Sequence, residues 1–300
     1  MTNVVTLIGA PGLAAGTVAA VRDAVAGLAA DVAEPDWLAP CVACDIAFDG
    51  PDTTSIEAAV RRRLDHEVGG APVDAVIQPA LGRRKRLLVA DMDSTIIEGE
   101  SLDELAALAG VGDAVAAITA RAMAGEIDFR QALLERVALL KGAPADLLDR
   151  VYAGVAPTPG AAALVRIMRA DGAYTALVSG GFRYFTGRIR DRLGFDHDEA
   201  NELEIAEGRL TGAVVEPVMN RDGKAAALTR LCAARRLPPA DSLAVGDGAN
   251  DLTMLQRAGL GVAFHAKPAV RAAAPARIDH ADLTALLYIQ GYRRDQIDAG

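Results

Sequence analysis

Leu87-Leu88-Val89-Ala90-Asp91-Met92-Asp93-Ser94-Thr95 is the stretch that decides the fold of this 300-residue chain. Its four apolar residues predict a buried parallel strand, and two carboxylates follow where that strand ends. Carboxylates this close repel each other and lose hydration on burial, so a protein keeps such a pair mainly where a cation, a proton or a substrate offsets the repulsion. Open α/β sheets bind their ligands at this end of the strands. The alternative interpretation is a simple turn, which Asp also favours.

Two later segments repeat this pattern of a strand followed by polar residues and glycines. A strand candidate over 174–178 leads into Ser179-Gly180-Gly181, and another over 242–245 leads into Gly246-Asp247-Gly248-Ala249-Asn250-Asp251. Glycines allow the backbone to approach a ligand closely. If the three strands are parallel neighbours, their carboxyl ends meet at one edge of the sheet, and this edge would bind a metal ion and a phosphate group.

The order of these motifs, with a lysine between the second and the third, resembles the haloacid dehalogenase-like phosphatases. The resemblance is greatest to the phosphoserine phosphatase family and covers about Arg86 to Ala281. It implies an α/β fold, with a doubly wound parallel sheet and a helical cap insert. It also implies a phosphoric monoester hydrolase that converts O-phospho-L-serine to L-serine and phosphate, the last step of serine biosynthesis, with Mg²⁺ and an aspartyl-phosphate intermediate.

The same resemblance assigns the catalytic and metal-binding roles. Asp91 would be the nucleophile, and Asp93 would act as acid and base, which requires a raised pKa. Asp91, Asp247 and the backbone carbonyl of Asp93 would hold Mg²⁺, a cation that prefers oxygen ligands. For Asp251 two interpretations stay open, a place beside the metal and a favourable position at a helix N-terminus.

Substrate binding is likewise assigned from the family pattern. Ser179, Gly180 and Asn250 would contact the phosphoryl group, and Lys224 would neutralise both the nucleophile and the phosphate. Lys267 is the second candidate for that lysine. In the cap, Glu100 would bind the substrate ammonium and Arg136 its carboxylate, with Met123 and Phe129 as apolar walls. Without the resemblance, Glu100 and Arg136 would be interpreted as solvated helix charges.

The helical insert begins directly after the first catalytic motif. Ser101-Leu102-Asp103-Glu104 has the spacing of a capping box, so a helix is expected to begin there. Further helices are expected over 113–124 and 129–141. An insert of helices at this position would form a lid over the site.

The first 82 residues contain no catalytic motif. Apolar patterns predict strands over 4–8, 33–38, 42–48 and 73–78 and helices over 12–28 and 52–64, the β-α-β-β-α-β order of ferredoxin-like domains. This order resembles the ACT modules of some phosphoserine phosphatases. We therefore expect a small α+β ferredoxin-like (ACT-like) domain at 1–82, and a phosphatase domain at 83–300 with its cap at about 100–155. Whether the first domain binds L-serine or another amino acid, or only supports structure or dimerisation, stays open.

Composition limits the partners. With 51% hydrophobic and 24% charged residues the chain can bury a sizeable core, and its net charge of −9 argues against a nucleic-acid partner. No apolar stretch reaches the length of a membrane span and no signal peptide is recognisable, so no membrane partner and a cytoplasmic location are expected. Cys41 and Cys44 have the spacing of a metal or redox pair, but buried strand residues are the favoured interpretation. A homodimer is expected by analogy only.

Two other functions stay open. One is a related enzyme that hydrolyses another small phosphomonoester or transfers its phosphoryl group, and Glu100 and Arg136 are the residues that discriminate against it. The other is an amino-acid-sensing binding protein whose second domain is inert. The complete charged set of Asp91, Asp93, Lys224 and Asp247 argues against this second alternative.

Overall fold

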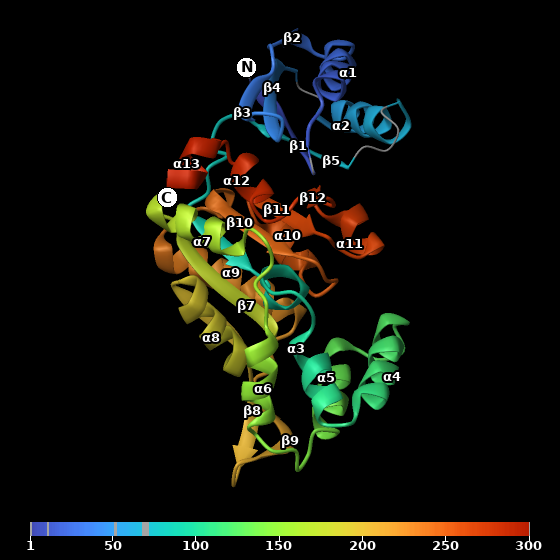
Figure 1. The fold of residues 1–300 in the computed structure, drawn as a ribbon, viewed down its shortest axis with the longest axis vertical. Helices are drawn as coiled ribbons and strands as arrows, with labels where there is room; N and C mark the ends of the chain where they lie inside the picture. Colours follow the sequence, from blue (N-terminus) through green and yellow to red (C-terminus); the bar gives the residue numbers. More distant parts are fainter. Residues whose placement is uncertain (1, 11, 51–52, 68–71, 300) are drawn as a thin grey trace.

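The computed structural model describes residues 2–10, 12–50, 53–67 and 72–299. Three parts follow one another along the molecule: a small N-terminal sheet with two helices, a central sheet covered by helices, and a group of helices at the far end (Figure 1). In the described residues no helix combines the length and apolarity needed to cross a bilayer.

Seven strands form the central sheet, in the order β12-β11-β10-β6-β7-β8-β9. Neighbouring strands are parallel except for β8 and β9, which form an antiparallel hairpin at one edge. The motif-bearing strands β10, β6 and β7 are therefore adjacent, with β6 in the middle. The strands are β6 (Leu87–Ala90), β7 (Tyr174–Phe182), β8 (His197–Ala206), β9 (Arg209–Val215), β10 (Ser242–Gly246), β11 (Leu260–Phe264) and β12 (Ala276–Ile278).

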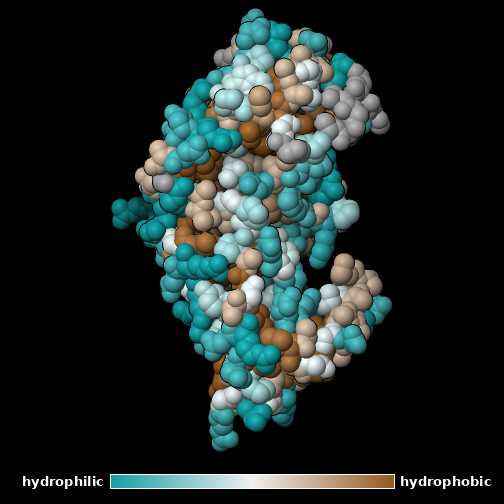
Figure 2. Space-filling model, viewed as in Figure 1, coloured by the Kyte–Doolittle hydropathy of each residue, from teal (hydrophilic) through white to brown (hydrophobic). Residues whose placement is uncertain are grey.

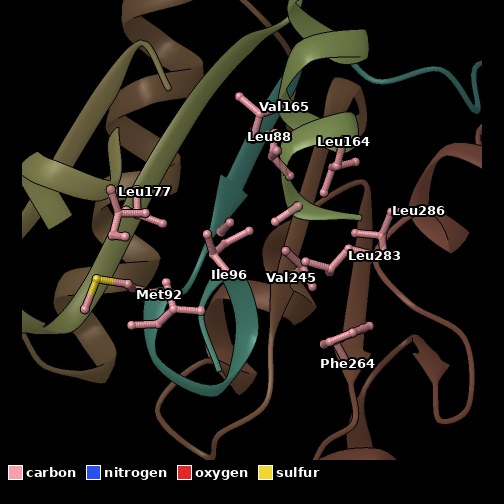
Figure 3. Packing of buried hydrophobic residues seen from close by; sticks show 14 of the residues in the cluster. Leu88, Met92, Ile96, Leu164, Val165, Leu177, Val245, Phe264, Leu283 and Leu286 are labelled. Carbon is pink, nitrogen blue, oxygen red and sulfur yellow. The ribbon is translucent and has the colours of Figure 1, made fainter. Parts of the chain in front are cut away.

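Helices cover both faces of this sheet. They are α7 (Ala161–Ala170), α8 (Arg183–Leu193), α9 (Arg221–Arg235), α10 (Leu252–Arg257), α11 (Pro268–Ala273), α12 (Ala285–Tyr288) and α13 (Arg294–Ala299). Within β6, Leu88 belongs to the hydrophobic cluster on one face and Val89 to that on the other. Figure 3 shows the first cluster, which includes Leu88, Leu177 and Val245 from three adjacent strands together with Leu164 of α7. Burial on both faces explains why β6 is continuously apolar rather than alternating.

The N-terminal part is an antiparallel sheet in the order β2-β4-β1-β5, with β3 also paired to β4. The strand expected over 33–38 is confirmed only in its second half, by β3, while residues 33–35 lie outside any strand and the short strand β2 ends before them. Pro35 lies between β2 and β3, and a proline cannot donate a hydrogen bond within a strand ladder. The elements are β1 (Asn3–Gly9), α1 (Ala15–Ala26), β2 (Ala30–Val32), β3 (Asp36–Ala39), β4 (Ala43–Asp49), α2 (Thr53–Arg62), a π-helical turn (Arg63–Glu67) and β5 (Val73–Pro79).

Four helices form the insert after β6: α3 (Ser101–Leu108), α4 (Gly112–Met123), α5 (Phe129–Ala138) and α6 (Leu147–Gly154). Helices α4 and α5 stand apart from the central sheet (Figure 1). Helix α3 begins at Ser101 as expected, but the capping box is wrong. The N-cap residue is Glu100, without a side-chain cap, and the buried Ser101 hydroxyl has no hydrogen-bond partner among the residues that the structure describes. The Ser101 N–H donates instead to Asp93, 2.9 Å away.

The N-terminal sheet packs directly on the central part. Ile8 and Val76 belong to the same hydrophobic cluster as Tyr288 and Ile289. A hydrogen bond also crosses this interface between the N-terminal sheet and the central part, because Gln78 Nε2 donates to the backbone oxygen of Ile289 over 2.5 Å. One face of the N-terminal sheet is therefore continuous with the apolar core of the central part, and its other face packs in a separate cluster with its own helices.

Candidate active site

The carboxyl ends of β10, β6 and β7 meet beside the cap and enclose a cavity of about 210 Å³. Figure 2 shows the surface hollowed between the α4–α5 helices and the body of the molecule. The sheet supplies one wall of the cavity and helices α3 to α5 supply the other. Eight of the predicted site residues line it: Asp91, Asp93, Glu100, Arg136, Ser179, Gly180, Asp247 and Asn250.

The ninth, Lys224, lies beneath the cavity in the first turn of α9, with no solvent-exposed surface. Its ammonium is 2.7 Å from Asp91 Oδ2 and 2.6 Å from Asp251 Oδ1. Burial alone would lower the pKa of Lys224, but attraction by Asp251 and Asp91 outweighs burial and the net shift is upward. Lys224 therefore stays charged and fixes one oxygen of the predicted nucleophile.

Asp251 is fully buried and is held on both sides. Its Oδ1 contacts Lys224, and its Oδ2 accepts the Gly248 N–H over 3.0 Å. Gly246 makes room for it, since a Cβ there would lie 2.4 Å from Asp251 Cγ. Although Asp251 precedes α10, its side chain caps no helix N–H. The carboxylate thus serves the site rather than the helix end.

Asp91, Asp247 and Asp251 form the cluster that could hold a metal ion, with one oxygen of each lying within 4.8 Å of the others. Burial, and then the charge of Asp91, raise the pKa of Asp247 to about 6. The negative charge of the cluster is therefore only partly compensated by the protein. Carboxylate oxygens are the donors preferred by hard divalent cations, so the residues fit such an ion.

Asp93 differs from Asp91 in its surroundings. Burial, and then the charges of Glu100 and Asp91, raise its pKa to about 7, although it accepts the Ser101 N–H. No cation contacts its carboxylate among the described residues. A carboxyl group with a pKa near neutrality can both donate and accept a proton, as an acid–base catalyst must.

The cap wall carries opposite charges for the far end of a ligand. Ser94, at a positive φ of 53°, donates its hydroxyl to Glu100 Oε1 over 2.7 Å. Arg136 donates to the backbone oxygen of Ala132 over 3.2 Å, which leaves the rest of its guanidinium free to donate into the cavity. Burial lowers the pKa of Arg136, and Asp103 and Glu100 oppose that shift. The wall can therefore bind an ammonium and a carboxylate side by side.

The end of β7 supplies donors for an anion. Ser179 Oγ accepts the Gly181 N–H over 2.9 Å, so its own hydroxyl hydrogen is free to donate. A Cβ on Gly181 would lie 2.6 Å from Asp93 Oδ2, and one on Gly180 would lie 2.8 Å from the Phe129 ring. A side chain at either position would therefore have to displace Asp93 or Phe129, so glycine lets this loop lie against both.

The family model for haloacid dehalogenase-like hydrolases matches residues 88–256, more than half of the chain. The chain belongs to this hydrolase family. It is 47% identical over 231 residues to a phosphoserine phosphatase of Archaeoglobus fulgidus. The aligned region covers 76% of this chain and 67% of the relative. A phosphoserine phosphatase of Streptomyces coelicolor is 42% identical over 301 residues, 99% of this chain and 72% of the relative.

Solved structures agree with the sequence relatives. An unliganded crystal structure of a probable phosphoserine phosphatase from Vibrio cholerae matches this chain with a TM-score of 0.76 and 32% sequence identity. The match covers 100% of this chain and 89% of the Vibrio chain. The predicted α/β fold of a haloacid dehalogenase-like hydrolase and the predicted membership of the phosphoserine phosphatase family are confirmed. The ACT-like identity of the N-terminal part stays a prediction.

Several lining residues of this hydrolase site were not predicted from sequence. Asp103, Thr119 and Leu133 come from the cap helices, whose spacing gives no sign of which side chains face the cavity. Lys267 also lines the cavity, although it was considered only as a substitute for Lys224. Met123, expected as an apolar wall, is the last residue of helix α4, is 67% exposed and is not among the residues that line the cavity.

Proposed function

We propose that this enzyme hydrolyses O-phospho-L-serine to L-serine and phosphate, as the names of its relatives indicate for them. The observation that carries the proposal is the convergence of a nucleophile, an acid–base group, an anion-binding loop and the Glu100–Arg136 pair on one cavity. Its volume of about 210 Å³ suits a small metabolite. Drug-sized ligands occupy pockets of roughly 300–1,000 Å³.

In the first half of the reaction, Asp91 attacks the phosphorus atom and the bond between phosphorus and the serine oxygen breaks. Lys224 and the Met92 N–H fix the two oxygens of Asp91, which orients it for attack. Asp93, in its protonated form, gives its proton to the departing serine oxygen. Ser179 and the backbone at Gly180 donate hydrogen bonds to the phosphoryl oxygens.

In the second half, a water molecule attacks the phosphorus of the aspartyl-phosphate. Asp93 is now deprotonated and accepts the proton of that water. The bond between phosphorus and Asp91 breaks, which releases phosphate and restores the Asp91 carboxylate and the protonated form of Asp93. A pKa of about 7 for Asp93 matches both directions of this proton transfer near neutral pH.

We propose Mg²⁺ as the metal, held by Asp91, Asp247 and the backbone carbonyl of Asp93, with Asp251 beside them. The oxygen-only donor set and the uncompensated charge of the acidic cluster support this ion over softer metals. When bound, it would offset the repulsion between the carboxylates and the phosphoryl group.

The test is phosphate release from L-phosphoserine, with Mg²⁺ and with EDTA, by the wild type, Asp91→Asn and Glu100→Gln. We expect Mg²⁺-dependent turnover that Asp91→Asn abolishes. Glu100→Gln should lower kcat/KM for phosphoserine by about 100-fold, because a site built around a polar partner discriminates strongly when the partner is lost. The same variant should change hydrolysis of p-nitrophenyl phosphate little, since that substrate has no ammonium group.

Glu98→Gln is the matched control, because Glu98 is an exposed carboxylate two residues earlier that does not line the cavity. If the wild type cleaves p-nitrophenyl phosphate but not phosphoserine, its membership of the hydrolase family stands and the proposal that phosphoserine is its substrate is refuted. In that outcome another small phosphomonoester takes its place.

The division into residues 1–82 and 83–300, a regulatory or dimerising role of the first part and a cytoplasmic location are further proposals. Two helices on one face of an antiparallel sheet support the ACT-like assignment. Calorimetric titration of L-serine into the protein tests amino-acid binding by the first part. The same titration of Asp91→Asn and Glu100→Gln distinguishes this binding from binding of L-serine at the active site.

A further inference from the structure

Lys267 lines the active-site cavity, yet the proposed reaction gives it no role. It is the N-cap residue of α11, and its N–H lies 3.4 Å from the backbone oxygen of Asp247. This places Lys267 at the metal and phosphoryl end of the cavity. Unlike Lys224, its ammonium has no carboxylate partner among the residues that the structure describes.

The positive charge of Lys267 acts on two carboxylates of the cavity, those of Asp247 and Glu100. Burial raises the pKa of Asp247 and of Glu100, and the positive charge of Lys267 opposes both shifts. The lining contains five carboxylates, from Asp91, Asp93, Glu100, Asp103 and Asp247, but only two cationic side chains, from Arg136 and Lys267. The ammonium of Lys267 would therefore reduce the repulsion that a doubly charged phosphoryl group meets on entering this cavity.

The N-terminal sheet reaches this region through Asp74 of β5. The side chain is buried, with 4% of the residue exposed, and its carboxylate accepts three backbone N–H groups from the turn that follows β12. Asp279 donates over 2.6 Å, His280 over 3.2 Å and Ala281 over 2.8 Å. Three bonds to one turn fix its position relative to β5, and they offset part of the cost of burying the charge.

From that turn, two sets of contacts lead to Lys267, one on each side of it. On the first side, the backbone oxygen of Ala281 lies 2.9 Å from Nε2 of His265, two residues before Lys267. On the second side, Asp279 pairs with Nε of Arg271 over 3.0 Å, and the Arg271 N–H bonds to the Lys267 carbonyl in α11 over 3.0 Å.

We propose that Lys267 binds the phosphoryl group of the substrate, and that Asp74 of the N-terminal sheet is a positioning residue that holds Lys267 at the cavity. A lysine side chain has many rotamers, so fixing its backbone from both sides reduces the entropy lost when its ammonium binds an anion. The N-terminal part thereby contributes to substrate affinity without lining the cavity. The proposal rests on the phosphatase function proposed above.

The experiment measures KM and kcat of the full chain for phosphoserine and for p-nitrophenyl phosphate, together with competitive inhibition by inorganic phosphate. Lys267→Ala should raise both KM values and the inhibition constant of phosphate about tenfold, and kcat less, because both substrates share the phosphoryl group. Lys267→Arg, which keeps the charge, should restore much of the affinity. The expected pattern contrasts with Glu100→Gln, which affects phosphoserine selectively.

Asp74→Asn should raise KM several-fold in the wild type but have no further effect on KM in Lys267→Ala. This non-additivity reports positioning, since a general loss of stability would act equally in both backgrounds. Asp45→Asn is the matched control, because Asp45 is also a buried carboxylate of the N-terminal sheet but binds Arg83 and Thr6 instead of the turn. Should Asp74→Asn fail to fold, Arg271→Gln interrupts the second set of contacts without altering the N-terminal sheet.

An unchanged KM and phosphate inhibition in Lys267→Ala would overturn the binding role. Equal losses from Asp74→Asn with and without Lys267, or the same loss from Asp45→Asn, would overturn the positioning role. Because p-nitrophenyl phosphate and inorganic phosphate report on the same contact, the outcome does not depend on phosphoserine being the substrate.

Discussion

Asp91 and Asp93 are two residues apart in the chain, yet their surroundings give them different chemistry. The carboxylate of Asp91 is bound by the Lys224 ammonium at one oxygen and by the Met92 N–H at the other, which hold it in one orientation. The carboxylate of Asp93 is partly buried beside Glu100 and accepts one N–H bond, and its pKa rises to about 7. One group is thus suited to attack and the other to proton transfer.

This difference predicts the behaviour of Asp93→Asn. An amide can neither donate the proton to the leaving serine oxygen nor accept one from water, so turnover of phosphoserine should fall by about 10²–10⁴-fold. p-Nitrophenol leaves without protonation, so that substrate should give a burst of p-nitrophenol stoichiometric with enzyme, followed by slow release of phosphate. Rapid-quench kinetics measures the burst. Equal loss of the first step with both substrates would contradict the assigned role.

At the scale of elements, the end of β7 is shaped to fit beside the loop after β6. Gly181 lies so close to Asp93 that a Cβ would come within 2.6 Å of its Oδ2 and 3.1 Å of Ser179 Oγ. The contacted atoms are the ends of side chains rather than backbone. A methyl group could therefore be accommodated by moving the catalytic carboxylate.

Gly181→Ala should consequently lower kcat by about tenfold or more while changing the melting temperature little, since small displacements of catalytic groups are costly. Gly187→Ala, in helix α8, is the control, because its Cβ would only make an ordinary contact of 3.9 Å with Asp198. Activity assays with thermal unfolding of both variants check this. If Gly181→Ala were fully active, the exact position of the Asp93 carboxylate would not matter for catalysis, and the argument would be contradicted.

At the scale of the whole molecule, the acidic site lowers the stability of the metal-free protein. Burial raises the pKa of Asp247 to about 6, above its value in the unfolded chain. Between about pH 4 and 6 the folded protein therefore holds more protons at this position than the unfolded chain does. The contribution of this position to the free energy of unfolding falls as pH rises through that range.

Asp247→Asn should therefore be more stable than the wild type in EDTA at pH 7, by on the order of 1–3 kcal/mol, and the difference should shrink toward pH 4. Saturating Mg²⁺ should stabilise the wild type more than the variant, because the ion binds only the folded state. Urea unfolding across pH measures both effects. Asp298→Asn, at an exposed position of α13, should show neither effect, and a wild type more stable than Asp247→Asn at every pH in EDTA would contradict the argument.

The sequence by itself determined the fold class, the family and most residues of the cavity. A buried strand is apolar over consecutive residues, as in Leu87–Ala90, and the polar residues that end it are adjacent in the chain. Parallel strands bring such ends to one edge, so the residue pattern alone is enough to place Asp91, Ser179 and Asp247 together. These signals are local in the chain, so they can be recognised in a single sequence.

Only the tertiary structure decided which partners each group acquires. The burial of Lys224 between Asp91 and Asp251 joins three elements distant in the chain. The raised pKa of Asp93 depends on its burial, although its neighbours Glu100 and Ser101 are close in sequence. The bond from Asp74 to the turn at 279–281 spans more than 200 residues. Burial and long-range contacts set these properties, and residue types and their spacing do not encode them locally.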